Sequence, residues 1–354
     1  ARDVAERQGE RILLVPELIS HDMERRLCRW AGDTASRYAQ VLSFTRLARR
    51  VAESVGAAAE ECLDKGGRVV AMAAAVRQLH SKLKAYASVE TRPEFLSELV
   101  NAVDEFKRCG ISPEDLMNAS RQTEGNLAQK LEELSLILES YDGLCANGKK
   151  DPRDQMNWLL EELADGDFAE THTFYVVGFP DFTRQHMAIL QELMTGRDLT
   201  VALTCDSPNS DRTAFEKAAH TAKELMRCAG EVGAETACEV LQPRQRPLLN
   251  VCRALFQGSL PVLPEGQEYL QVFRVNGISK ECDLAARQVL DLVEAGARYR
   301  DIGIVCSDLN AYGRMLSLTF GRVGIPLYRS GTEDILHKPG IRTVRCALEA
   351  ARGG

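Results

Sequence analysis

Several short stretches of this 354-residue chain carry residue types that bind phosphate groups in other proteins. Residues 143–150 have the spacing GxxxxGK, which in a phosphate-binding loop surrounds a nucleotide with backbone N–H groups and a lysine. Such a loop joins a strand to a helix and has Ser or Thr after the lysine to hold magnesium. Here the stretch follows a long amphipathic helical pattern, and Lys150 occupies the magnesium-ligand position. We therefore interpret it as a helix end with a solvated basic turn.

Other catalytic patterns are incomplete. Glu105, Phe106 and Lys107 mimic the ExK half of a metal-dependent nuclease site, but Phe106 occupies an apolar position of a helical pattern, which indicates a structural role. No GxSxG or HExxH motif occurs. Among the eleven cysteines, no two lie closer than Cys228 and Cys238, so no spacing typical of a metal site exists. The sequence predicts no catalytic and no metal-binding residue.

Residues suited to binding a polyanion cluster between positions 34 and 52, a segment with four arginines and no acidic residue. Phe44 has a ring that can stack on a nucleic-acid base. Arg46 and Arg49, three residues apart on one helical face, can bind phosphates or bases. The structural alternative is that Phe44 belongs to the core and that the arginines only solvate a helix.

The elements that must position these residues alternate between strands and helices. Residues 11–15 form a short apolar run closed by Pro16, which is typical of a strand buried on both faces of a parallel sheet. From residue 170 the strand–helix alternation returns, with strands over 173–177 and 199–204 and helices over 183–194 and 214–228. We expect parallel sheets with helices on both faces.

Two further parts of the chain have different textures. Residues 53–165 lack strand signals and repeat apolar residues at helical spacing, and residues 53–170 hold 23 acidic and 13 basic residues. A Pro/Arg-rich stretch over 242–247 and an interdomain linker over 260–266 lead to a second α/β part. There we expect strands over 269–275 and 302–306, helices over 280–295 and 309–323, and a final helix.

Composition limits the function classes. The overall charge of −7 arises in the helical segment, so it does not exclude a nucleic-acid partner for the remaining residues, which carry a small positive charge. The longest run without polar residues, 69–76, is far shorter than the roughly 20 residues that cross a bilayer. The N-terminus has no apolar signal segment, and the scattered cysteines fit a reducing compartment. We expect a cytoplasmic protein with no membrane partner.

The end of the strand over 173–177 bears on ATP hydrolysis. A nucleotide-hydrolysing enzyme needs an acid there to hold magnesium, and a second acid usually acts as base. Val177 and Gly178 occupy these positions. Asp181 follows Pro180, and we interpret it as a turn or N-cap residue.

An ordered set of stretches resembles the AddB family, the B subunits of AddAB ATP-dependent helicase–nucleases, over essentially the whole chain. The stretches are 12–17, 41–51, 66–68, 106–108 with 111–113, and 178–183. Glu281 and residues 299–305 and 324–326 are similar to the opening of the second motor domain of superfamily 1 helicases.

The resemblance implies an α/β fold of the P-loop NTPase class, like superfamily 1 helicases. It implies a first RecA-like domain over 1–52 and 166–259 without its P-loop, an all-helical insertion over 53–165 and a linker over 260–268. The start of a second, truncated RecA-like domain would follow over 269–354. The chain starts within the helix that follows the family's P-loop and ends within a helix, so we expect a fragment.

The departures from the family imply a chain that does not hydrolyse ATP itself. Val177 and Gly178 replace the acidic pair, and Ser307 lies where motor helicases carry a phosphate-binding arginine. We expect no cofactor in this fragment and no nucleotide-binding residue. ATP with magnesium, and the iron–sulfur cluster of the family's nuclease domain, are implied only for regions outside it.

The function implied is that of a DNA-binding part of a helicase–nuclease (exonuclease) subunit in double-strand-break repair and homologous recombination. In superfamily 1 folds the loops over 16–20 and 43–50 face single-stranded DNA, and in AddB they are associated with reading a recombination hotspot. Leu18 and Arg49 stand where relatives carry a polar amide and an aromatic residue. The expected partners are an AddA-type motor subunit and single-stranded and duplex DNA. The expected DNA-binding residues are Ser20, Ser43, Phe44, Arg46, Arg49, Phe179, Phe182 and Thr183.

Two other functions stay open. An active superfamily 1 motor would need the missing acidic pair, and a non-DNA scaffold on a decayed NTPase fold would not bind single-stranded DNA in a salt-dependent way.

Overall fold

A computed structural model describes residues 10–32, 35–56, 62–86, 92–196, 198–210, 212–241, 270–329, 335 and 338–351. The chain divides into two compact units, Ala1–Pro261 and Val262–Gly354. The Pro/Arg-rich stretch 242–247, the expected linker 260–268 and residues 1–9 lie outside the described residues. No helix in the described ranges is long and apolar enough to cross a membrane.

The first unit contains a four-stranded parallel sheet in the order β2-β1-β3-β4. Leu14 of the central strand β1 pairs with Leu42 of β2 on one side and with Val176 of β3 on the other. This confirms the expected α/β class and its parallel strands. The strands are β1 (Arg11–Leu14), β2 (Ala39–Leu42), β3 (Thr173–Val177) and β4 (Leu199–Ala202).

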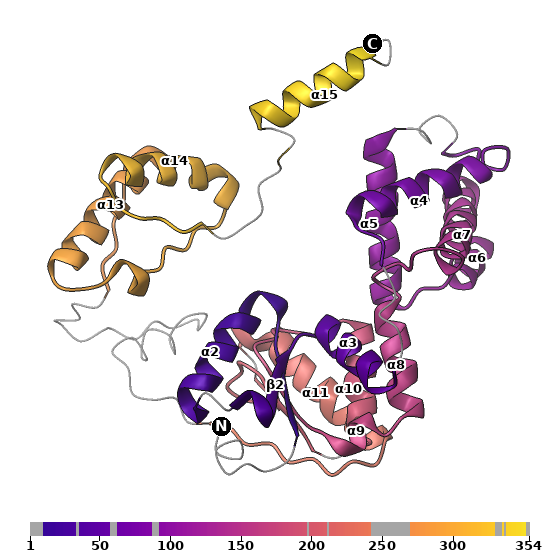
Figure 1. Ribbon diagram of the computed structural model, residues 1–354, viewed down its shortest axis with the longest axis horizontal. Helices are drawn as coiled ribbons and strands as arrows, with labels where there is room; N and C mark the ends of the chain where they lie inside the picture. Colours follow the sequence, from indigo (N-terminus) through magenta and orange to yellow (C-terminus); the bar gives the residue numbers. More distant parts are fainter. Residues whose placement is uncertain are drawn as a thin grey trace. The chain divides into compact units, whose positions relative to one another are not determined.

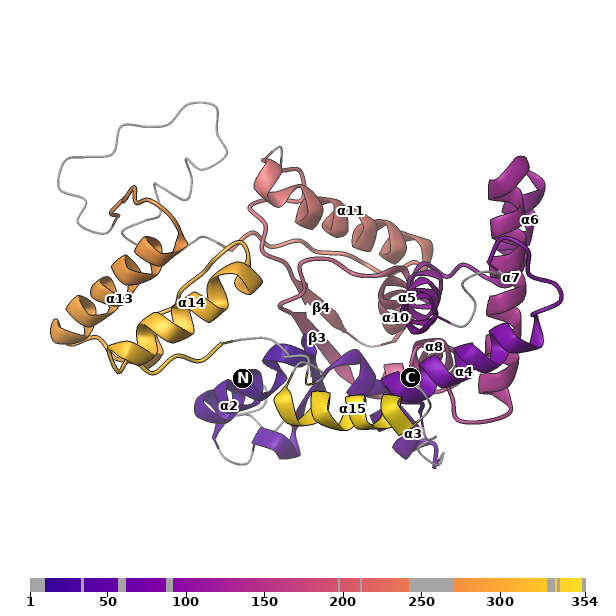
Figure 2. The same ribbon diagram turned by 90° about the horizontal axis from the view of Figure 1, so that it is seen from above.

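Helices cover both faces of this sheet (Figures 1 and 2). On one side, Leu27 and Ala31 of α2 pack on Ala35 and Ala39. On the other side α3, α8 and α10 share one hydrophobic core with the strands. The helices of this α/β body are α2 (Ser20–Ala31), α3 (Phe44–Ser54), α8 (Gln155–Asp165), α9 (Phe168–Thr171), α10 (Arg184–Leu193) and α11 (Glu216–Glu231).

Between β2 and β3 the chain forms a block of helices with its own hydrophobic core, as the apolar spacing predicted (Figure 1). Ser112 starts one of them with a capping box, in which its hydroxyl accepts from Asp115 N and the Asp115 carboxylate accepts from Ser112 N. Within the described residues of the block, the only strand-like pairing is an isolated bridge between Cys62 and Lys150. The helices are α4 (Lys65–Gln78), α5 (Pro93–Cys109), α6 (Pro113–Arg121) and α7 (Gly125–Ala146).

A buried charge network joins these helices to the segment that leads into α8. Asp151 has no exposed surface, and its Oδ2 accepts hydrogen bonds from the Tyr141 hydroxyl at 2.6 Å and from Arg68 Nη2 at 3.1 Å. Arg68 Nη2 also bonds Asp104 Oδ1 at 2.5 Å. Burial alone would raise the pKa of the Asp104 carboxyl, but hydrogen bonds from Arg153 and Arg68 lower it to about 2.

A second buried carboxylate holds the loop after α4. Glu133 of α7 accepts hydrogen bonds from the backbone N–H groups of Lys84 and Ala85, both at 2.8 Å, and of Tyr86 at 3.2 Å. Burial opposes the charged form of Glu133, but these N–H groups stabilise it and lower its pKa.

In the second unit two helices pack together through residues such as Cys282, Val289, Leu316 and Phe320. The expected strands over 269–275 and 302–306 are wrong for the described residues, because 270–275 and 302–306 have no strand partner there. An apolar run becomes a strand only when a neighbour completes its hydrogen-bond ladder. The helices are α13 (Ile278–Glu294), α14 (Leu309–Arg322) and α15 (Pro339–Ala351).

Replacing Arg68 by Ala should lower the free energy of unfolding by about 3–5 kcal/mol, because Asp151 would remain buried without its charged partner. Stability should also fall as the pH drops from about 4 to about 2, where the folded-state pKa of Asp104 lies below its value of 3.8 in the unfolded chain. Urea unfolding at several pH values measures both effects. Arg227→Ala, which breaks an exposed pair with Glu231, is the control and should cost about 1 kcal/mol or less. A cost for Arg68→Ala equal to that of the control would contradict the role of the network.

Replacing Glu133 by Ala should cost about 3 kcal/mol, because three backbone N–H groups would lose a charged acceptor. In the parent protein this contribution should be lost as the pH falls through the lowered pKa of Glu133. Glu132→Ala changes the exposed neighbouring carboxylate and should stay within about 0.5 kcal/mol of the parent. Equal unfolding midpoints in urea for the two variants would show that Glu133 does not hold the loop.

Candidate nucleic-acid interface

The carboxyl ends of the four parallel strands meet at one edge of the sheet, where open α/β folds bind ligands. The loops after β1 and β3 touch there. Gly178 has a φ of +88°, and a Cβ at this position would lie 2.8 Å from Ile19 Cδ1. Only glycine combines this backbone conformation with so close a neighbour, so Gly178 brings the two loops together.

Three of the expected DNA-binding residues gather here as aromatic rings. Phe44 stacks on His186, with ring centroids 4.1 Å apart and an interplanar angle of 10°. Phe179 meets Phe44 edge-on at 5.5 Å and packs on Phe182 at 5.2 Å. Phe179 and Phe182 remain partly exposed.

Phe44 is only 4% exposed and belongs to the core of the α/β body. This corrects the expectation that its ring is available to stack on a base. Phe44 opens α3 on the face that packs against the sheet, so the chain direction after β2 turns it inward.

His186 completes the cluster and was not expected from the sequence. Burial, together with the positive charge of Arg108 from α5, lowers the pKa of its imidazole to about 4. The ring is therefore neutral near pH 7, which suits stacking against Phe44. Its only sequence signal is its position one turn into a helix, close to apolar neighbours.

The hydroxyl side chains among the expected site residues have local structural partners. Ser43 is the N-cap of α3 and accepts from Arg46 N at 3.3 Å. Thr183 caps α10 and accepts from His186 N at 3.2 Å. Ser20 donates to Glu17 O at 2.9 Å and is buried. These groups fix the first turns of the helices that border the site.

The two expected arginines differ. Arg46 Nη1 lies 2.9 Å from Glu24 Oε1 of α2, and both side chains are partly exposed. Arg49 is exposed and makes no ion pair with any residue that the structure describes. Arg49 is therefore the more available of the two for a phosphate. Leu18, in the loop after β1, is 97% exposed at the same edge.

The end of β3 carries Val177 and Gly178, followed by the exposed Asp181. Asp181 Oδ2 lies 3.9 Å from Lys217 Nζ, and Thr183, not Asp181, is the N-cap of α10. The described ranges contain no group of three His, Cys, Asp or Glu side chains with metal-binding geometry.

The stretches that mimic catalytic motifs have structural roles. Helix α7 ends at Ala146, within the GxxxxGK spacing, and no strand precedes it. Lys107 is buried and binds Asp154 Oδ1 at 2.6 Å and Asp142 Oδ1 at 2.8 Å.

The first turn of α10 also contacts the helical block. Arg184 Nη1 donates to Cys109 O at 3.4 Å, and Gln185 Nε2 donates to Asn157 Oδ1 of α8 at 2.9 Å. The loop with Phe179 and Phe182 is thus followed by a helix held at its start by the block.

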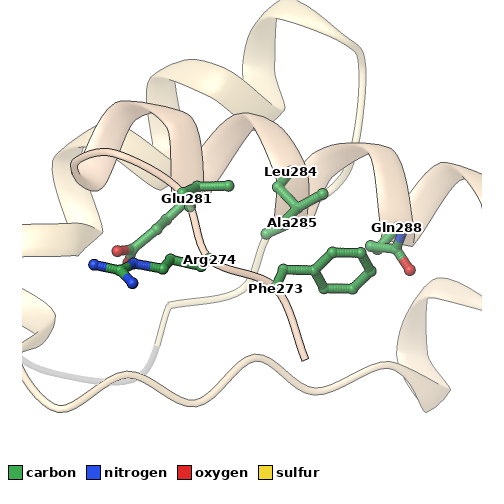
Figure 3. A pocket seen from close by; sticks show the side chains of 7 residues that line it. Phe273, Arg274, Glu281, Leu284, Ala285 and Gln288 are labelled. Carbon is green, nitrogen blue, oxygen red and sulfur yellow. The ribbon is translucent and has the colours of Figure 1, made fainter. Parts of the chain in front are cut away.

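A separate hollow of about 500 Å³ lies in the second unit, between residues 273–275 and α13 (Figure 3). Glu281 is its acidic group, and its Oε2 already accepts from the Tyr312 hydroxyl at 2.5 Å. The remaining lining is mostly apolar or neutral, with Phe273, Arg274, Val275, Leu284, Ala285 and Gln288. Its side chains do not form a catalytic set.

Comparison with known proteins identifies the family. A family model described as "ADDB, N-terminal" matches residues 2–251. The chain is 29% identical to the B subunit of an ATP-dependent helicase/deoxyribonuclease from Symbiobacterium thermophilum, over 96% of this chain and 31% of that protein. It is 30% identical to the protein of the same name in Moorella thermoacetica, again over 96% and 31% of the two chains. The corresponding Bacillus velezensis protein is 26% identical over 97% and 31%. The chain thus spans about a third of the length of these relatives, and because the family model covers most of it, the chain belongs to the AddB family.

Proposed function

We propose that this chain is the part of an ATP-dependent helicase/deoxyribonuclease that guides single-stranded DNA within its AddB-type component. Its α/β body would be the first RecA-like domain of a superfamily 1 fold (residues 1–52 and 166–259), with residues 53–165 as the helical insertion. Residues 269–354 would start a second such domain after a linker at 260–268. The parallel sheet with helices on both faces supports this assignment.

The observation that carries the DNA-guiding role is the carboxyl edge of the sheet. There the partly exposed rings of Phe179 and Phe182 lie in the loop after β3. Arg49, which has no ion pair among the described residues, lies on α3, the helix that follows β2. Rings that can accept a base and cations that can accept phosphates are the two components of a surface for single-stranded DNA. In this proposal Phe44 and His186 support Phe179 from beneath, while Ser20, Ser43 and Thr183 fix the bordering backbone.

The segment would brace a motor subunit of the AddA type rather than hydrolyse ATP itself. The relatives carry the name of one lettered component of an enzyme, which supports a complex with at least one other chain. Within that complex the role would be double-strand-break repair and recombination, including possible contact with a recombination hotspot in the unwound strand. Val177 and Gly178 at the end of β3 disfavour an active motor, because neither can hold magnesium.

Replacing Arg49 by Gln should weaken binding of single-stranded DNA and flatten the slope of log K against log salt by roughly 0.7, the share of one phosphate contact. Arg46→Gln should have a smaller effect, because Glu24 already offsets its charge. Fluorescence anisotropy with a labelled oligothymidylate at several salt concentrations measures both. Arg77→Gln, at an exposed site in the helical block, is the charge-matched control. Identical slopes for Arg49→Gln and the control would favour the non-DNA scaffold.

Replacing Asp181 by Asn should leave ATP hydrolysis by the complete two-subunit enzyme unchanged, because Asp181 is exposed three residues beyond Gly178. Steady-state ATP turnover in the presence of DNA is the measurement. Asp206→Asn, in the loop after β4, serves as a control for changing a surface acid at the same edge. A loss of two or more orders of magnitude for Asp181→Asn alone would support the active-motor alternative.

A further inference from the structure

The outer face of α2 carries a compact block of three arginines and a tryptophan. Arg25 and Arg29 are four residues apart and form one row, and Arg26 and Trp30 form the adjacent row. All four side chains are exposed, and Trp30 is 64% exposed although it has the largest side chain of any residue type. The opposite face of α2 packs on the sheet, so this block faces away from the body.

The charges of this block are largely uncompensated. Arg26 pairs with Asp22 at 2.8 Å, whereas Arg25 and Arg29 have no ion pair with any part of the chain that the structure describes. Arg29 also lies in the last turn of α2, where its charge favours the helix dipole. The dipole accounts for one basic residue there. It does not account for Arg25 or for an exposed indole beside them.

The chemistry of the block fits a nucleic-acid strand better than a protein surface. Protein interfaces place Trp and Arg within a central apolar patch. On α2 the only large apolar side chain that is exposed is Trp30. Arginines spaced along a backbone path beside a ring for a base are the arrangement found in grooves for single strands. Because an indole stacks only on an unpaired base, duplex DNA is the poorer fit.

The block is continuous with the carboxyl edge of the sheet. Helix α2 begins at that edge with Ser20, and its Glu24 is bound by Arg46 from α3 at 2.9 Å. β2 is an edge strand, so the two helices meet around it. We propose that a single strand leaving the carboxyl edge continues along the outer face of α2, with phosphates on Arg25 and Arg29 and a base on Trp30. This proposal rests on the proposed function, because it extends the same DNA path.

Fluorescence of Trp30 tests the proposal directly. The chain has two tryptophans, and Trp158→Phe leaves Trp30 as the only one. In this background, short oligothymidylates should bind without changing Trp30 emission, and longer ones should quench it. Trp30→Ala should weaken binding of the long oligonucleotide roughly five- to one-hundred-fold and leave the short one unchanged.

The arginines are tested by salt dependence. The double variant Arg25→Gln/Arg29→Gln should flatten the salt slope for the long oligonucleotide by roughly 1.4 and leave the slope for the short one unchanged. The control is Arg77→Gln/Arg121→Gln, which removes two exposed arginines from the helical block and should behave as the parent.

The outcomes separate this proposal from the proposed function. Binding that depends on Arg49 but never quenches Trp30 would overturn the α2 path and leave the DNA-guiding role intact. Absence of binding to any oligonucleotide would overturn both. Equal quenching by duplex DNA or by polyglutamate would also overturn the α2 path, because the block would then attract anions without selecting a single strand.

Discussion

The arrangement of the first unit depends on one buried carboxylate, Asp151. A charge with no exposed surface is stable only when partners replace the water it has lost, and here Arg68 and the Tyr141 hydroxyl do so. Arg68 comes from α4, far from Asp151 along the chain, and Tyr141 comes from α7. Because Asp151 lies four residues before α8, its network fixes where the helical block ends and where α8 begins.

Helix α8 transmits this constraint to the sheet. Its Leu159 and Leu163 lie in the core that α3 and α10 also share. α3 and α10 in turn begin at the carboxyl edge, with Ser43 and Thr183 as their caps. An insertion of more than a hundred residues thus leaves the edge of the sheet in a defined shape. Rigid elements hold binding side chains more precisely than free loops do.

At that edge the structure separates support from contact. Phe44 and His186 stack beneath the surface, and burial keeps the imidazole neutral. Phe179, Phe182 and Arg49 remain accessible. A stacked layer under an exposed ring limits the rotamers of that ring before any ligand arrives, which lowers the entropy lost on binding.

The sequence by itself determined the α/β class, the strands at 11–14 and 173–177 and the helical block, because apolar periodicity reflects burial of each element along its own length. It also identified residues 143–150 and Lys107 as structural. Only the tertiary structure decided that Phe44 is buried, that His186 joins it and that Arg46 is paired with Glu24. These facts depend on contacts between residues more than twenty positions apart, which no local pattern encodes. The same reason explains why the apolar runs at 270–275 and 302–306 lack strand partners among the described residues: a strand needs a neighbour as well as a suitable sequence.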